Sequence, residues 1–210
     1  MNVAEEFKQR LLRALYDEPP LTTLRGDDDL NPGFPRIRPD RPPRAAAVLV
    51  PLIMRQEGVH VLLTQRPDHM RNHAGQIAFP GGAIDPEDQG PVEAALREVR
   101  EETGLTADFI TPIGFLDGYL TSSHYRVVPV VGLVRPGFEL KPDPAEVADI
   151  FEVPFDFLMD ASNHTRHAVL WQGQERFCHA MPFGSRFIWG ATAGMLHNFH
   201  ERWRGADHGL

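Results

Sequence analysis

The chain has 210 residues, of which 42% are hydrophobic and 24% charged, and this composition is typical of a soluble globular protein of one domain with elaborations. Its formal net charge of -8 argues against unspecific nucleic-acid binding, because a nucleic acid attracts a basic surface. An anionic substrate would therefore need local help from a cation or from clustered arginines.

The N-terminal part divides into a helix and an arm. Residues 3–16 predict an amphipathic helix that carries charges throughout, which is not the pattern of a signal peptide. Residues 18–43 are rich in proline, glycine and charge and predict an irregular arm, so we place the main domain at residues 44–205. The longest apolar run, residues 45–54, is too short to span a bilayer, and we expect a cytoplasmic protein without a membrane partner.

The rest of the chain predicts a mixture of strands and helices. Expected strands cover residues 45–54, 59–66, 110–119, 126–134, 146–154, 165–172 and 175–182. A last helix is expected from about Ile188 to Trp203, with a broad apolar face that we interpret as core packing. Cys178 lies in a predicted strand, and we expect it to be a buried small side chain rather than a nucleophile.

A helix with three glutamates follows a Gly81-Gly82 turn and is expected to end at Gly104. Glu98, Glu101 and Glu102 are spaced i, i+3 and i+4, so they share one face. Like charges on one face repel, and a divalent cation relieves that repulsion; carboxylate oxygens suit magnesium or manganese. The alternative is a solvated face whose glutamates are paired with nearby arginines, Arg97 and Arg100.

The segment Arg97-Glu98-Val99-Arg100-Glu101-Glu102-Thr103-Gly104-Leu105 resembles the second half of the Nudix box, R-E-U-x-E-E-x-G-U, in which U is aliphatic. The first half departs from the box: Ala83 and Gln89 stand where the family has a glycine and a glutamate. Gly82 lies one residue further from the arginine than the family glycine does, so the loop is one residue longer. We expect Asp88 to replace the missing glutamate as the partner of Arg97.

A second motif precedes the turn and narrows the resemblance. It consists of Leu62-Leu63-Thr64-Gln65-Arg66, then Arg71, His73 and Gly75-Gln76, and then Phe79-Pro80-Gly81-Gly82. Together these residues resemble the coenzyme A pyrophosphatase branch of the Nudix hydrolases, and the similarity covers roughly residues 44–200. Pro67 departs from the serine that often follows the first arginine in that branch.

The resemblance implies an α/β fold, the Nudix α/β/α sandwich with a mixed sheet between helices. It implies a pyrophosphatase that depends on Mg²⁺ or Mn²⁺ and cleaves coenzyme A or acyl-CoA to 3′,5′-ADP and 4′-phosphopantetheine or its acyl form. Glu98, Glu101 and Glu102 would hold the metal with the Gly82 carbonyl. The general base is left open among Glu101, Glu102 and the remote Glu146, which is otherwise a solvated loop charge.

The polar loop supplies the expected substrate contacts. Arg66 and Arg71 would bind phosphate groups, since arginine binds phosphate through two parallel hydrogen bonds, and His73 and Gln76 would donate hydrogen bonds. The alternatives are that Arg66 pairs with a surface carboxylate and that His73 packs the loop.

Other functions remain open on the sequence alone. The substrate could be ADP-ribose, a dinucleotide or a nucleoside triphosphate. A nucleotide-binding domain without catalysis is a different class, against which the intact glutamate triplet argues. The expected partner is a small molecule, and the sequence is compatible with a homodimer.

Overall fold

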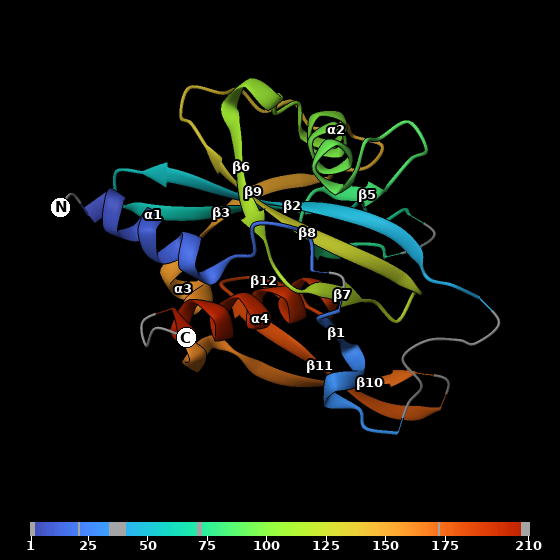
Figure 1. Ribbon diagram of the computed structural model, residues 1–210. Coiled ribbons are helices and arrows are strands. Elements are labelled where there is room, and N and C mark those ends of the chain that lie inside the picture. Colours follow the sequence, from blue (N-terminus) through green and yellow to red (C-terminus); the bar gives the residue numbers. More distant parts are fainter. Residues whose placement is uncertain (1–2, 21, 34–40, 71–72, 172, 207–210) are drawn as a thin grey trace.

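The computed structural model describes residues 3–20, 22–33, 41–70, 73–171 and 173–206 (Figure 1). Within these ranges the chain forms four α-helices and two sheets. The helices are α1 (Val3–Ala14), α2 (Pro91–Thr103), α3 (Phe155–Met159) and α4 (Ala191–Gly205).

The larger sheet is mixed and has the strand order β1-β7-β8-β2-β3-β4, with β5 on β2, β6 on β8 and β9 on β3. Its strands are β1 (Leu24–Gly26), β2 (Arg44–Arg55), β3 (Gly58–Gln65), β4 (Ile77–Ala78), β5 (Gly81–Ala83), β6 (Ile110–Phe115), β7 (Gly118–Leu120), β8 (Tyr125–Val134) and β9 (Asp149–Pro154). The central strands β2 and β8 pair in parallel along ten residues. Both strands are long apolar runs, as expected for strands covered on both faces.

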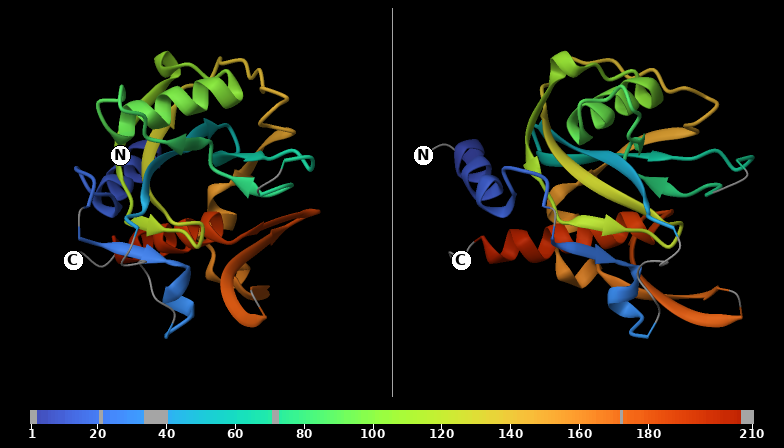
Figure 2. Two further views of the ribbon diagram at one scale, coloured as in Figure 1. Left: turned by 90° about the vertical axis from the view of Figure 1, so that its right-hand side faces the viewer. Right: turned by 45° about the vertical axis from the view of Figure 1, so that its right-hand side comes forward.

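Helices cover the two faces of this sheet. Figure 2 shows α2 on one side and α4 on the other. Side chains alternate along β2, so that Leu49 and Ile53 pack beneath α2 while Val50 and Leu52 join the core that contains α1, α3 and α4. The predicted α/β/α sandwich with a mixed sheet between helices is confirmed.

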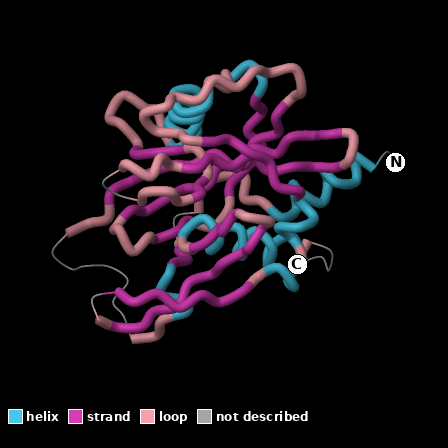
Figure 3. The backbone as a smooth tube through the Cα atoms, turned by 180° about the vertical axis from the view of Figure 1, so that it is seen from behind, coloured by secondary structure: helices cyan, strands magenta, loops and turns pink. Residues whose placement is uncertain are grey.

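A second, antiparallel sheet packs against α4 and consists of β10 (Thr165–Trp171), β11 (Gln174–Phe183) and β12 (Arg186–Trp189) (Figure 3). The predicted hairpin of β10 and β11 is confirmed, although its turn residue Gln172 lies outside the described residues. Ile188, expected to begin the last helix, instead lies in β12. Gly190 adopts φ +66° and redirects the chain, so α4 starts after it. Cys178 is buried, as expected.

Three other sequence-based boundaries are wrong. The arm was expected to be irregular, but Leu24–Gly26 pairs in parallel with β7 and continues into a 3₁₀ turn at Asp27–Leu30. The strand expected over 110–119 is two strands separated by Leu116 and Asp117, although the Leu116 N–H still donates to the Pro129 carbonyl of β8. The strand expected from residue 146 begins at Asp149, since the Val147 N–H turns back to the Asp143 carbonyl.

The N-terminal helix is part of the main core, in which Leu11 and Ala14 are buried with residues of α4. The division of the chain at residue 44 stays a prediction. In the described part of the chain, no helix combines the length and apolar character needed to cross a membrane.

Four histidines form a cluster where β11 and the segment before β10 meet α4: His164, His179, His197 and His200. The rings of His179 and His197 stack with centroids 4.0 Å apart, and Nδ1 of His164 lies 3.0 Å from Nδ1 of His197. Nε2 of His164 donates to the Leu158 carbonyl, so a neutral His164 accepts at Nδ1. The pKa of His179 is lowered to about 4, mainly by burial and also by the neighbouring charges of His197 and His164.

This cluster predicts acid sensitivity. Because the pKa of His179 is below its unfolded value of about 6.5, the unfolded chain binds more protons, and stability is lost as the pH falls from about 6.5 to 4. His179→Phe keeps a ring against His197 and should flatten this decline by on the order of 1 kcal/mol, or about 2–4 °C in Tm. Thermal unfolding between pH 4 and 8 measures it. The control is His69→Gln, which removes an exposed loop histidine. If Tm falls with pH equally in the wild type, His179→Phe and His69→Gln, the prediction is contradicted.

Candidate active site

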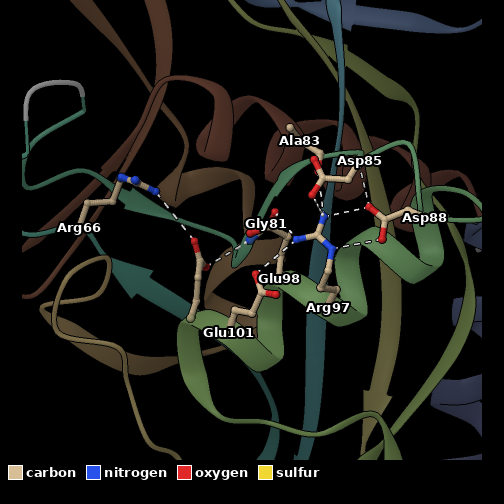
Figure 4. Close-up of polar contacts among 9 residues, drawn as sticks. Arg66, Gly81, Ala83, Asp85, Asp88, Arg97, Glu98 and Glu101 are labelled. Atoms are coloured by element: carbon tan, nitrogen blue, oxygen red, sulfur yellow. Dashed lines mark hydrogen bonds and ion pairs between the residues drawn. The ribbon is translucent and has the colours of Figure 1, made fainter.

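Helix α2 is positioned by its ends and its apolar side. It begins with Pro91 after Gly90 and ends at Gly104, whose φ is +74° and whose N–H donates to the Arg100 carbonyl. Ala95 and Val99 are fully buried in the core beneath the helix. Figure 4 shows Glu98 on the side of α2 that faces the turn at β5, away from that apolar side.

Two of the three glutamates lie directly against the glycine turn. The carboxylate of Glu102 is 5% exposed and accepts a hydrogen bond of 3.2 Å from the Gly81 N–H. Glu98 is 17% exposed, and a Cβ at Gly82 would lie only 2.8 Å from its Oε2. Glu101 is 60% exposed and points outward. The sequence placed the three on one face, and the structure buries them unequally.

Arg97 joins the helix to the preceding loop. Its Nε and Nη2 donate to the two oxygens of Asp88 at 3.1 and 2.9 Å, and Nη2 also donates to the Ala83 carbonyl at 3.1 Å. Nη1 donates to Glu98 at 2.9 Å and to Glu101 at 3.3 Å. The prediction that Asp88 pairs with Arg97 is confirmed. This ion pair holds the pKa of Asp88 below its usual range.

The alternative prediction, that arginines neutralise the glutamates of α2, therefore holds for only part of this face. Arg97 neutralises Glu98 and Glu101, but the buried Glu102 has neither Arg97 nor Arg100 as an ion-pair partner in the part of the chain that the structure describes. Among the described residues, the ion-pair partner of Glu102 is Arg66, whose Nη1 lies 3.9 Å from Oε1 of Glu102.

Electrostatics distinguish Glu102 from the rest. The pKa of its carboxyl is raised to about 8, mainly by burial and also by the charges of Glu98 and Glu146, against the lowering effects of Arg66 and the Gly81 N–H. Burial also raises the pKa of Glu98, and Glu146 contributes there too. Glu146 is exposed in the turn before β9, close enough to act on both buried glutamates. Such clustered acids with raised pKa values are typical of functional sites.

The structure describes three of the four residues of the polar loop that were predicted to bind substrate. Arg66 follows β3, and its buried Nε has no hydrogen-bond partner among the described residues. Nδ1 of His73 lies 2.8 Å from Oε1 of Gln76, so these two side chains contact each other. His73 is exposed and adopts φ +58°. Arg71 lies outside the described residues, and the substrate roles of all four stay predictions.

The carboxylate oxygens of the site suit a divalent cation, but they do not converge on one point in this structure. Among the described residues, no group of three or more histidine, cysteine or carboxylate side chains converges closely enough to hold a metal ion. Arg97 supplies the positive charge between Glu98 and Glu101. The carboxylate oxygens of Glu98 and Glu102 beside the Gly81-Gly82 backbone are nevertheless the hard donors that Mg²⁺ and Mn²⁺ prefer. The metal roles stay predictions.

Sequence reasoning missed one contributor. The Ala83 carbonyl holds Arg97 in place, and a backbone acceptor leaves no signature in residue type.

The two turn glycines predict different consequences for the same substitution. At Gly81, with φ +156°, a Cβ would lie 2.6 Å from the Val48 backbone, so Gly81→Ala should destabilise the fold by about 1–3 kcal/mol and lower Tm by several degrees. At Gly82 the neighbour is the flexible end of Glu98, so Gly82→Ala should leave Tm nearly unchanged and displace that carboxylate. Thermal unfolding of both variants and a structure of the second test this. Equal losses of Tm would contradict it.

Comparisons with known proteins agree with this geometry. The family model of the NUDIX domain matches residues 43–172. Proteins named uncharacterized Nudix hydrolase NudL, from Yersinia pestis (strain Pestoides F) and Yersinia pseudotuberculosis serotype O:1b (strain IP 31758), are each 38% identical over 159 residues, covering 76% of this chain and 79% of theirs.

Solved structures with a similar fold are more distant. The MutT protein from Methanosarcina mazei Go1 is 20% identical with a TM-score of 0.48 over 81% of this chain and 97% of its own. A C. elegans Ap4A hydrolase complex is 20% identical with a TM-score of 0.47 over 53% of this chain and 80% of its own. The family match spans more than half of the chain, and the protein therefore belongs to the Nudix hydrolases, enzymes that act on nucleoside diphosphate derivatives.

Proposed function

We propose that this Nudix hydrolase cleaves the diphosphate of coenzyme A or acyl-CoA to 3′,5′-ADP and 4′-phosphopantetheine or its acyl form. The observation that carries the proposal is the pair of carboxylates, the buried Glu102 and the half-buried Glu98, set against the Gly81-Gly82 turn beside Arg66. The choice of coenzyme A rests on the motif of residues 62–82, which resembles that branch of the family.

Nudix hydrolases generally need a divalent cation, and Glu98, Glu101, Glu102 and the Gly82 carbonyl would hold Mg²⁺ or Mn²⁺ here. When bound, such a cation neutralises phosphate oxygens and lowers the pKa of water. Glu98 is kept in place by Arg97, and Glu102 by the Gly81 N–H.

The general base remains open among Glu101, Glu102 and Glu146. Glu101 and Glu146 are exposed enough to reach a water molecule, whereas Glu102 is buried and accepts a hydrogen bond from the Gly81 N–H.

Arg66 is the best-supported contact for the substrate. Its charge faces the buried Glu102 rather than a surface carboxylate, and its unpartnered Nε is a donor for a phosphate oxygen. We propose that Arg71, His73 and Gln76 complete the clamp on the phosphates. A cytoplasmic location and a homodimer also remain predictions.

A substrate panel with Mg²⁺, read by mass identification of the products, tests the function. We expect kcat/KM to be higher for coenzyme A than for ADP-ribose or NADH, with 3′,5′-ADP among the products. A tenfold preference for ADP-ribose, a dinucleotide or a nucleoside triphosphate would refute the assignment to the coenzyme A pyrophosphatase branch. It would leave the assignment as a Nudix hydrolase unaffected. Binding without hydrolysis in Mg²⁺ and in Mn²⁺ would make this a non-catalytic Nudix domain.

Arg66→Ala separates two ways of holding coenzyme A. Dephospho-coenzyme A lacks the 3′-phosphate and keeps the diphosphate. If Arg66 contacts the 3′-phosphate, the variant should lose about ten- to a hundredfold in kcat/KM on coenzyme A and little on the dephospho form, because a charge-assisted hydrogen bond is worth about 1.5–3 kcal/mol. If Arg66 holds the diphosphate, both substrates should lose alike.

The matched control is Arg100→Ala, which removes an exposed arginine of α2. Small, equal losses in Arg66→Ala and in the control, on both substrates, would show that Arg66 does not hold the substrate.

A further inference from the structure

A cavity of about 470 Å³ lies on the side of the large sheet opposite α2, between α4, the end of α1 and residues 22–25 of the arm. In Figure 1, α4 lies below the sheet and α2 above it. The cavity is thus separate from the glutamates of α2. Its charged lining residues are three arginines and two acids: Arg13, Arg25, Arg202, Asp117 and Glu201.

One face of α4 forms a wall of this cavity. Asn198, Glu201, Arg202 and Gly205 follow the spacing i, i+3, i+4 and i+7, which places them along one side of the helix. Asn198 is only 5% exposed, and its Nδ2 has no hydrogen-bond partner among the described residues. A buried donor without an acceptor destabilises a protein. A ligand that brings an acceptor oxygen would satisfy it.

The acids of the cavity already have cationic partners. Glu201 is ion-paired with Arg25, and its other oxygen lies 3.8 Å from Nε2 of His197. Asp117 accepts from the Tyr16 hydroxyl at 3.2 Å and lies 3.9 Å from Nη1 of Arg202. These contacts leave the carboxylates little capacity for a ligand cation.

The donors of the cavity are less engaged. Nε of Arg13 makes a long hydrogen bond of 3.4 Å to the Ala206 carbonyl, and its terminal nitrogens have none within the described ranges. Thr22 and Thr23 also line this space. Free donors beside neutralised acids favour an anion, and arginine matches the geometry of phosphate. The volume exceeds that of a phosphate group and leaves room for an attached sugar or nucleoside.

We propose that this cavity binds a small phosphomonoester, with the phosphate on Arg13 and the Asn198 amide. The site is independent of the α2 glutamates and of the reaction proposed for them. It gives the arm a function, because residues 22–25 form one wall and would be held against α4 by the ligand.

A phosphate titration tests the proposal. The probe is inorganic phosphate, added to the ¹⁵N-labelled full chain in EDTA at constant ionic strength and followed by NMR. We expect saturable shifts of the Asn198 side-chain amide and of the backbone amides of Thr23, Arg25 and Gly205. Arg13→Gln should weaken phosphate at least about tenfold, whereas Arg204→Gln, which removes an exposed arginine of α4 outside the cavity, should not.

Asn198→Leu supplies a second readout. It removes the unpartnered donor, so it should raise Tm in the absence of phosphate and abolish the phosphate-dependent shifts at Thr23 and Arg25. Shifts confined to residues around Arg66 and Glu98 would overturn the proposal, as would equal binding by Arg13→Gln and Arg204→Gln. An equal response to acetate would overturn phosphate as the ligand class.

Discussion

The close approach of the α2 carboxylates to the Gly81-Gly82 turn is the constraint on which the rest of the site depends. β5 pairs with β2 only because Gly81 has no side chain to meet the Val48 backbone. That pairing brings the Gly81 N–H to Glu102 and the Gly82 backbone to Glu98. The parallel pairing of β2 with β8 forms the part of the sheet on which α2 packs, so the geometry of the site depends on the packing of the core.

Burial of the Glu98 and Glu102 carboxylates is unfavourable for an isolated fold, since each loses hydration and the charge of Glu98 helps to raise the pKa of Glu102. Arg97 offsets part of this through Glu98, and Asp88 keeps the guanidinium in position. Glu102 is left with a backbone N–H and a distant Arg66. The remaining unfavourable charge is what a bound cation would neutralise, so the arrangement exchanges stability for function.

The sequence predicts the features that depend on hydrophobic periodicity or on the pairing of opposite charges. Periodicity located the long strands and α2, and charge chemistry identified Asp88 as the partner of Arg97. It failed where tertiary contacts decide: β1 exists because β7 lies beside it, and β12 because Gly190 redirects the chain. The cavity beside Asn198 joins residues far apart in sequence, so no local pattern could indicate it. The metal roles rest on the spacing of three glutamates along α2 and on the family resemblance, and they stay predictions.

The most direct test of the account is the affinity for Mn²⁺, measured by calorimetry on the wild type, Glu102→Gln and Glu139→Gln. Both substitutions remove one negative charge, but Glu139 is an exposed loop residue outside the site. The account predicts that Glu102→Gln weakens Mn²⁺ at least about tenfold, since a charged ligand is lost, while Glu139→Gln binds like the wild type. Equal affinities for all three proteins would contradict the central claim that the buried glutamates of α2 hold the cation.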